Sequence, residues 1–299
     1  MADELSNNHS ERCFLSAPER FVFIINTEVT IKSENMTLTE NKRKLFNIWE
    51  GIYDSWQDAE KNACGSGFGG DVYHQRSLTA AKECCHSLCE GIPIPQFHKQ
   101  RSTLLPITVA MMLSNYENIK ILDFGGGFGI GYMTLLESVE NDMDSIDYTI
   151  VEVPEIIESA SALHAGKVKY LSALPQSEQY NLVYVASSLQ YIEHWANLLT
   201  DLAAYNSEYI LLSDVFAGSN PAFVSLQNYY DSKIPHWFIN FDELIEVLDS
   251  IGYKLKMKSY AGSRRLHFDD TLPMDNFPEQ YRVKQTLHLL LQKKSVCKS

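Results

Sequence analysis

The chain has 299 residues, enough for one large domain or for one domain with a smaller appendage, and its 45% hydrophobic and 11% aromatic content excludes a generally disordered protein. Its 38 acidic and 25 basic residues give a net charge of -13, which argues against nucleic acid or an anionic membrane as the main partner, because phosphate binding needs clustered Lys and Arg. No run approaches the ~20 apolar residues that span a bilayer, and the first residues lack a signal-peptide pattern, so we expect a cytoplasmic protein.

Residues 1–44 are polar and irregular, and we expect them to form an N-terminal extension. Within them, the apolar run FVFIINTEV at residues 21–29 predicts a short strand. Met36 is an alternative candidate for the start of the protein.

Residues 45–117 are predicted to form a mainly helical segment, with the clearest helical patterns at 78–91 and 103–117. This segment is a candidate lid, dimer surface or acceptor site. The first of these patterns contains Cys84, Cys85, His86 and Cys89. One interpretation is a zinc or redox site, because Cys85 and Cys89 share a helix face. The alternative is an ordinary helix with small thiols packed inward, and the absence of a CxxC or HxxxH pair favours it, so we expect no metal.

Residues 118–299 alternate apolar strands with helices, which indicates a parallel sheet covered on both faces. The predicted strands are residues 120–124, 147–153, 168–171, 181–187, 208–216, 253–260 and 286–294, and the predicted helices are 131–139, 154–166, 194–205 and 241–252. The last two strands are separated by a polar loop that lacks the helical pattern of a crossover connection. We therefore expect these two strands to pair antiparallel. The fold class is therefore α/β: a Rossmann-like sheet of seven mostly parallel strands with an antiparallel final strand.

A glycine-rich stretch, ILDFGGGFGIGY at residues 121–132, follows the first of these strands. Glycines at a strand end predict a loop that lets a ligand approach the backbone. The dinucleotide pattern G-x-G-x-x-G fails in every register, because its third glycine would fall on Ile130, Tyr132 or Thr134. A P-loop pattern is absent from the sequence as well.

The stretch from Asp123 to Gly129 instead matches D-x-G-x-G-x-G and resembles the first motif of class I S-adenosylmethionine-dependent methyltransferases. The resemblance implies S-adenosylmethionine as cofactor and a ribose-binding carboxylate at Glu152, 29 positions after Asp123. A carboxylate suits a vicinal diol because it accepts both hydroxyl protons, although Glu152 could also be a solvated residue at a helix start. The cofactor-binding residues implied in this way are Asp123, Phe124, Gly125, Gly126, Gly127, Gly129, Glu152, Val153, Ser172, Ala173, Ser187 and Ser188.

A narrower resemblance begins at about Trp49 and extends to about Lys294. Its N-terminal pattern is carried by Gly51, Tyr53, Ser55, Trp56, Ala59, Gly67 and Phe68, and it is similar to that of a bacterial methyltransferase family whose genes often lie among those for surface-polysaccharide synthesis. As the function we expect O-methylation of a sugar or glycan, with acidic and phosphorylated acceptors included. A non-catalytic cofactor-binding protein, another group transferase on the same fold and, less favoured, a nicotinamide-dependent oxidoreductase remain open.

A sugar hydroxyl needs a general base, and His194 and His236 are the candidates, with Asp214 orienting either one. For His194 the alternative is an exposed residue at a helix start, for His236 a plain loop packed on the core, and for Asp214 a turn cap. Aromatic residues in the same region predict a wall that stacks on the acceptor, namely Tyr191, Tyr229, Tyr230 and Trp237.

Arg264 and Arg265, together with the basic residues at 98–101, predict an acidic acceptor, because paired arginines bind carboxylate or phosphate. The alternative is scattered surface charge. We expect a small-molecule or glycan acceptor as partner and no nucleic acid, and the sequence leaves the oligomeric state open, a dimer included.

Overall fold

The computed structural model describes residues 47–261 and 271–295, which belong to one compact unit that begins at Leu45. The predicted extension at 1–44, its strand at 21–29 and Met36 lie outside the described residues. In the part of the chain that is described, no helix combines the length and the apolar character needed to cross a membrane.

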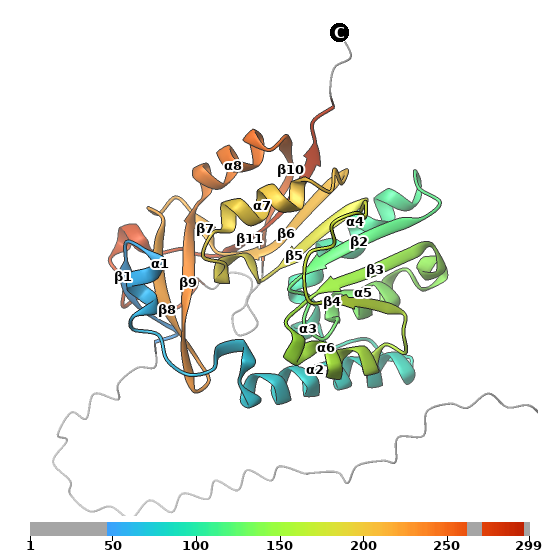
Figure 1. Ribbon diagram of the computed structural model, residues 1–299, viewed down its shortest axis with the longest axis horizontal. Coiled ribbons are helices and arrows are strands. Elements are labelled where there is room, and N and C mark those ends of the chain that lie inside the picture. The colour runs from blue at the N-terminus through green and yellow to red at the C-terminus, as the bar shows by residue number, and fades with distance from the viewer. Residues whose placement is uncertain (1–46, 262–270, 296–299) are drawn as a thin grey trace, which may run out of the picture. The chain divides into compact units, whose positions relative to one another are not determined.

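The main sheet has seven strands in the order β10-β11-β6-β5-β2-β3-β4 (Figure 1). These strands are β2 (Ile119–Phe124), β3 (Ile146–Val151), β4 (Val168–Leu171), β5 (Leu182–Ala186), β6 (Tyr209–Val215), β10 (Tyr253–Ala261) and β11 (Thr286–Lys293). Strands β2 to β6 are parallel, whereas β11 pairs antiparallel with both β6 and β10. The predicted Rossmann-like α/β class is confirmed, and each predicted strand of this sheet lies within two residues of an observed one.

Helices cover both faces of the sheet and bury two apolar clusters against it. One face carries α2 (Asp71–Cys89), α4 (Leu104–Leu113), α5 (Ile130–Ser138) and α6 (Pro154–Leu163), and the other carries α7 (Trp195–Ala203) and α8 (Phe241–Ser250). Local signals explain several helix starts: Pro154 begins α6, where its missing N–H costs nothing, and the Asn240 side chain caps α8 by accepting two backbone N–H groups.

A second sheet of four strands lies beside the first, and the sequence patterns did not predict it. Its order is β1-β8-β9-β7, from β1 (Trp49–Tyr53), β7 (Ala217–Gly218), β8 (Phe223–Tyr229) and β9 (Ser232–Asn240). In Figure 1 the blue β1 lies along the orange β8 and β9 hairpin, although 170 or more residues separate the paired positions. The mainly helical segment 45–117 therefore begins with a strand, and the region after β6 contains the β8–β9 hairpin.

The cysteine-containing pattern lies within α2. Cys84 is buried in the core, Cys89 is exposed, and the Cys85 thiol contacts the Met133 sulfur at 3.5 Å. The three thiols thus point to different surroundings, as in an ordinary helix that packs one face. Among the described residues, no group of His, Cys, Asp and Glu side chains could hold a metal ion.

Candidate functional site

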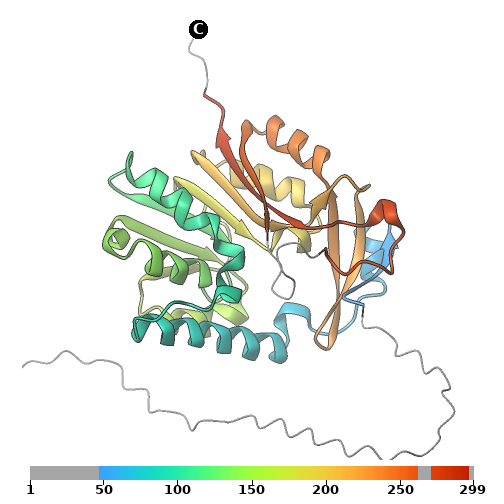
Figure 2. The same ribbon diagram turned by 180° about the vertical axis from the view of Figure 1, so that it is seen from behind.

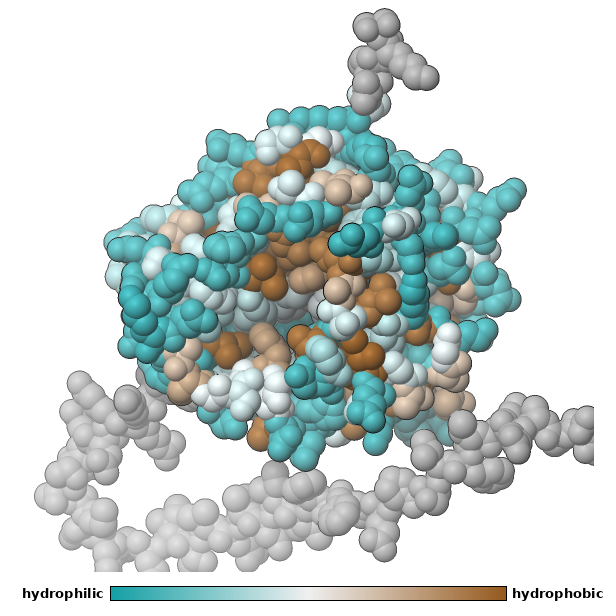
Figure 3. All heavy atoms as spheres, in the orientation of Figure 1, coloured by the Kyte–Doolittle hydropathy of each residue, from teal (hydrophilic) through white to brown (hydrophobic). Residues whose placement is uncertain are grey.

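A cavity of about 690 Å³ lies where the glycine-rich loop, the start of α2, the segment before α4 and the β8–β9 hairpin meet. Figure 2 shows α2 from behind, running alongside the helices of the main sheet, and Figure 3 shows hydrophobic side chains gathered near the centre of the opposite view. The residues that line the cavity include Phe68, Tyr73, Arg76, His98, Arg101, Asp123, Gly125, Gly126, Gly127, Ser187, Tyr191, Gln227, Tyr229 and Tyr230.

The loop after β2 has a backbone that requires glycine. Gly125, Gly127 and Gly129 have φ values of 70°, 57° and 77°, in the left-handed region that other residues rarely adopt. At Gly126, a Cβ atom would lie 2.4 Å from the Asp123 carboxylate. A Cβ at Gly127 would meet no atom within 4 Å, so this part of the backbone is open to an incoming ligand.

The carboxylate of Glu152 lies against this loop, directly after β3. Its Oε2 accepts a hydrogen bond from the Gly127 N–H at 2.9 Å, and its Oε1 accepts one from the Val153 N–H at 2.8 Å. Burial raises the pKa of Glu152, and the two backbone donors oppose that rise. The spacing of 29 residues thus brings the carboxylate and the glycine turn together, because β2 and β3 are adjacent parallel strands.

Asp123 supports the loop from inside the fold. The Tyr148 hydroxyl donates to its Oδ2 at 2.8 Å, while its buried Oδ1 has no hydrogen-bond partner among the described residues. Burial raises the pKa of Asp123 to about 7, and the Tyr148 hydrogen bond opposes that rise. A buried acceptor without a partner beside a cavity is a group that a bound ligand or water can satisfy.

The other predicted cofactor-binding residues fall into different places. Ser187 lines the cavity, whereas the Ser188 hydroxyl donates to the Phe124 carbonyl at 3.0 Å and so supports the turn. Ser172 and Ala173 are exposed after β4, whose last residue, Leu171, accepts the Glu152 N–H through its carbonyl. Val153 is exposed at the start of α6.

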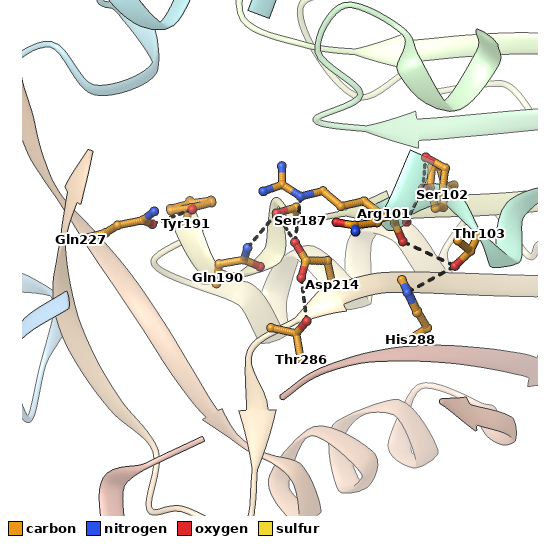
Figure 4. Close-up of polar contacts among 12 residues, drawn as sticks. Arg101, Ser102, Thr103, Ser187, Gln190, Tyr191, Asp214, Gln227, Thr286 and His288 are labelled. Atoms are coloured by element: carbon orange, nitrogen blue, oxygen red, sulfur yellow. Dashed lines mark hydrogen bonds and ion pairs between the residues drawn. The ribbon is translucent and has the colours of Figure 1, made fainter. Parts of the chain in front are cut away.

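Asp214 is buried at the end of β6, and its partner is Arg101 rather than a histidine (Figure 4). Its Oδ2 lies 3.0 Å from Arg101 Nε and accepts from the Ser187 hydroxyl, and its Oδ1 accepts from the Thr286 hydroxyl. Burial alone would raise the pKa of Asp214, but Arg101 and the two hydroxyl donors outweigh burial and hold it below its usual value. The expected role of orienting a histidine is corrected to that of holding Arg101.

Neither predicted base is among the residues that line the cavity. The side chain of His194 is 69% exposed at the start of α7, and its nearest ion-pair partner is Glu193 at 3.8 Å. His236 is fully buried among Trp49, Tyr191 and Phe216, and its ring nitrogens make no hydrogen bond to any other described residue. Burial lowers the pKa of His236 to about 3, so the ring stays neutral.

Three of the four predicted aromatic residues line the cavity, namely Tyr191, Tyr229 and Tyr230. The fourth, Trp237, is not among the lining residues: it stacks on Trp56 at 6.4 Å, and its indole N–H donates to the Glu193 carbonyl. Arg264 and Arg265 lie outside the described residues.

Several lining residues were not singled out from the sequence. Phe68 and Tyr73 pack their rings on Tyr229, and Arg76 lies 5.0 Å from the centre of the Tyr230 ring. Gln227 accepts the Tyr191 hydroxyl at 2.7 Å. The start of α2 gave no local signal of a site, although Phe68 belongs to the N-terminal pattern that carried the narrower resemblance.

Comparison with known proteins gives structural neighbours only, because no family model and no curated protein matches the sequence. The chain is similar in fold to a 1,6-didemethyltoxoflavin-N1-methyltransferase of Burkholderia thailandensis with bound S-adenosylhomocysteine, at 13% identity and a TM-score of 0.46, covering 78% of this chain and 94% of that one. A magnesium protoporphyrin IX methyltransferase of Synechocystis with bound S-adenosylmethionine matches at 12% identity and a TM-score of 0.46, covering 66% and 80%. The CcbJ methyltransferase of Streptomyces caelestis matches at 10% identity and a TM-score of 0.43, covering 73% and 99%. At these identities and scores the matches carry no argument about activity.

Proposed function

We propose that this chain is an S-adenosylmethionine-dependent methyltransferase that transfers a methyl group to an oxygen atom of a small acceptor. The observation that carries the proposal is the pairing of Glu152 with the glycine turn at Gly127, beside a cavity at the carboxyl ends of β2 and β5. In open α/β sheets, ligands bind at this edge.

The residues present fit the cofactor. The open backbone at Gly127 admits a nucleoside, and the Glu152 carboxylate next to it has lone pairs left for the two hydroxyls of a ribose. The unpartnered Oδ1 of Asp123 lies at the same turn, 3.1 Å from the position that a Cβ atom of Gly126 would take. Ser187, at the end of β5, would border the methionine part, and the exposed Ser172 and Ala173 would border the adenine.

When bound, S-adenosylmethionine supplies an electrophilic methyl carbon on a sulfonium. The task of this chain is to hold an acceptor oxygen in line with that carbon and to exclude water, and such positioning is worth ~7–11 kcal/mol of the barrier. The tyrosine side chains and Phe68 enclose the cavity and serve that purpose. Their ring faces also support the sugar or glycan acceptor predicted from the narrower resemblance, because sugars stack on aromatic rings.

The histidine and the tyrosines that line the cavity offer no evident general base. His98 has its Nε2 2.9 Å from Glu83, and burial raises the pKa of Tyr73 to about 12 and that of Tyr191 further. The two tyrosines therefore keep their protons near neutral pH. An acceptor oxygen that is already ionised, as in a carboxylate or phosphate, would need no base.

Two measurements test the proposal. S-adenosylhomocysteine should raise the melting temperature of the full chain, and NADH should not, because the glycine spacing does not match a dinucleotide loop. Methyl-tritiated S-adenosylmethionine, incubated with the chain and a panel of neutral and acidic sugars and small aromatic acids, should yield a labelled product. Stabilisation by NADH alone would indicate an oxidoreductase, and binding without any labelled product would indicate a non-catalytic protein or another transferase.

A further inference from the structure

Arg101 is held at the cavity by the carboxylate of Asp214, which two hydroxyl groups hold in turn. Asp214 accepts hydrogen bonds from Ser187 at 2.8 Å and Thr286 at 2.7 Å, in addition to its contact with Arg101 Nε. Both carboxylate oxygens are therefore occupied, and the guanidinium is fixed through one nitrogen only. Of the five N–H donors of a guanidinium, the four on its two terminal nitrogens are left for another group.

The backbone is strained at Asp214 and at Ser187, the residue that donates a hydrogen bond to Asp214. Ser187 and Asp214, at the ends of β5 and β6, have φ values of 55° and 54°, although neither is glycine. Such a residue is strained and persists where surrounding contacts hold it, commonly at a binding or catalytic site. The fold thus stabilises an unfavourable backbone at Asp214, which contacts Arg101, and at Ser187, which donates to Asp214.

The two terminal nitrogens of Arg101 point away from Asp214 (Figure 4). No hydrogen bond or ion pair joins them to any residue within 47–261 or 271–295. The side chain of Arg101 is 51% accessible, and because it lines the cavity this surface faces the enclosed space beside Tyr73, Tyr191 and Tyr229. A partly desolvated cation with free paired donors is suited to a carboxylate or phosphate, which accepts both bonds of the guanidinium fork.

The position of Arg101 separates it from the proposed ribose carboxylate. Glu152 follows β3, whereas Asp214 ends β6, and β2 and β5 lie between these strands. Arg101 is therefore on the β6 side of the cavity, next to the tyrosine rings of the hairpin, where the acceptor would lie beyond the methyl group.

We propose that the terminal nitrogens of Arg101 bind an oxyanion, carboxylate or phosphate, carried by a ring-shaped acceptor that packs on the surrounding tyrosines. This inference rests on the proposed function, since it concerns the acceptor of the same reaction. A carboxylate on the cofactor itself has the same chemistry, so the experiment must distinguish the two sources.

The test uses the full chain saturated with S-adenosylhomocysteine, with benzoate, phenyl phosphate and neutral benzamide as probes in a thermal-shift titration. We expect at least one of the two anions to bind about tenfold more tightly than benzamide, and Arg101→Gln to remove that preference, since one charged hydrogen-bonded contact is worth about that factor. Arg282→Gln is the control, because it removes a guanidinium of similar exposure outside the cavity. Arg101→Lys keeps a charge for Asp214 if the Gln variant fails to fold, and it should weaken the anion preference.

Two comparisons decide the source of the oxyanion. If Arg101 binds the acceptor, Arg101→Gln leaves the affinity for S-adenosylhomocysteine within about twofold of wild type. If that affinity falls while binding of 5′-methylthioadenosine, which lacks the amino-acid end, is unchanged, Arg101 holds the cofactor and the proposal is overturned. Equal binding of the anions and benzamide by the wild-type chain also overturns it, whereas failure of S-adenosylhomocysteine to bind at all is a failure of the proposed function.

Discussion

The backbone N–H of Gly127 lies 2.9 Å from Oε2 of Glu152, and this hydrogen bond joins the turn after β2 to the end of β3. Both groups are ones that the proposed cofactor would use, so ligand binding has to share or replace this contact. The proposed function depends on this arrangement, in which the Gly127 N–H and the Glu152 carboxylate meet at the carboxyl ends of parallel strands.

Removing the carboxylate should weaken cofactor binding. We expect Glu152→Ala to lower the affinity for S-adenosylhomocysteine at least tenfold, because the ribose hydroxyls lose a charged acceptor worth ~1.5–3 kcal/mol. Isothermal titration calorimetry measures the effect. Glu155→Gln, an exposed acidic residue in the first turn of α6, should bind as the wild type does. Equal affinities in all three proteins would remove Glu152 from the site.

The glycine turn can be tested with a pair of substitutions matched in backbone strain. Gly127 and Gly166 both have positive φ, at 57° and 77°, and an added Cβ at either one meets no atom within 4 Å. Valine at either position should therefore destabilise the fold by a similar amount, ~1–3 kcal/mol. Only Gly127→Val should abolish binding of S-adenosylhomocysteine. Loss of binding in both variants, or in neither, would show that the backbone of Gly127 has no special part in it.

Asp123 should make the stability of the free protein fall as pH rises. Its folded pKa of about 7 lies above the ordinary value of 3.8, so the contribution of this group is full below pH 4 and is lost as pH rises to about 7. Asp123→Asn keeps an acceptor for Tyr148 and removes the titration. We expect its unfolding free energy, relative to wild type, to increase between pH 4 and pH 8 by as much as ~4 kcal/mol. Urea unfolding at several pH values measures this, and Asp147→Asn, exposed on β3, should show no such trend.

His236 should make the stability of the free protein fall as pH is lowered. Burial lowers its pKa from 6.5 to about 3, so the neutral ring contributes stability above pH 6.5 that is lost as pH falls. His236→Phe lacks this loss. Its unfolding free energy, relative to wild type, should therefore rise by as much as ~2 kcal/mol as pH is lowered from 7 to 5. Thermal or urea unfolding across that range is the measurement. His194→Gln, at an exposed ring, should follow the wild type, and a parallel pH profile for His236→Phe would contradict the account.

The main sheet could be predicted from the sequence because its signals are local. The strand predicted at 168–171 coincides with β4, and the glycine run directly follows β2, as predicted. The hairpin was missed because its signals contradict the usual rules: the turn uses Tyr230 at φ 55° instead of glycine, and Pro235 lies inside β9. Its outer partner β1 is far away in the sequence, and no local pattern records such a pairing.

The site was harder to predict than the fold, because its side chains come together only in three dimensions. Arg101 and Asp214 are 113 positions apart and meet only through the packing of the segment before α4 on the end of β6. Whether a histidine is buried is equally non-local: His236 lies on an aromatic strand and turns inward, while His194 turns outward. The spacing of Glu152 from Asp123 was informative, because two adjacent parallel strands fix it.

A crystal structure of the full chain with S-adenosylhomocysteine tests the central claim most directly. The account predicts the ribose hydroxyls within about 3 Å of the Glu152 carboxylate, the nucleoside against Gly127 and the sulfur turned toward the tyrosine-lined side of the cavity. An empty cavity at saturating ligand, or a ribose bound away from residue 152, would contradict it.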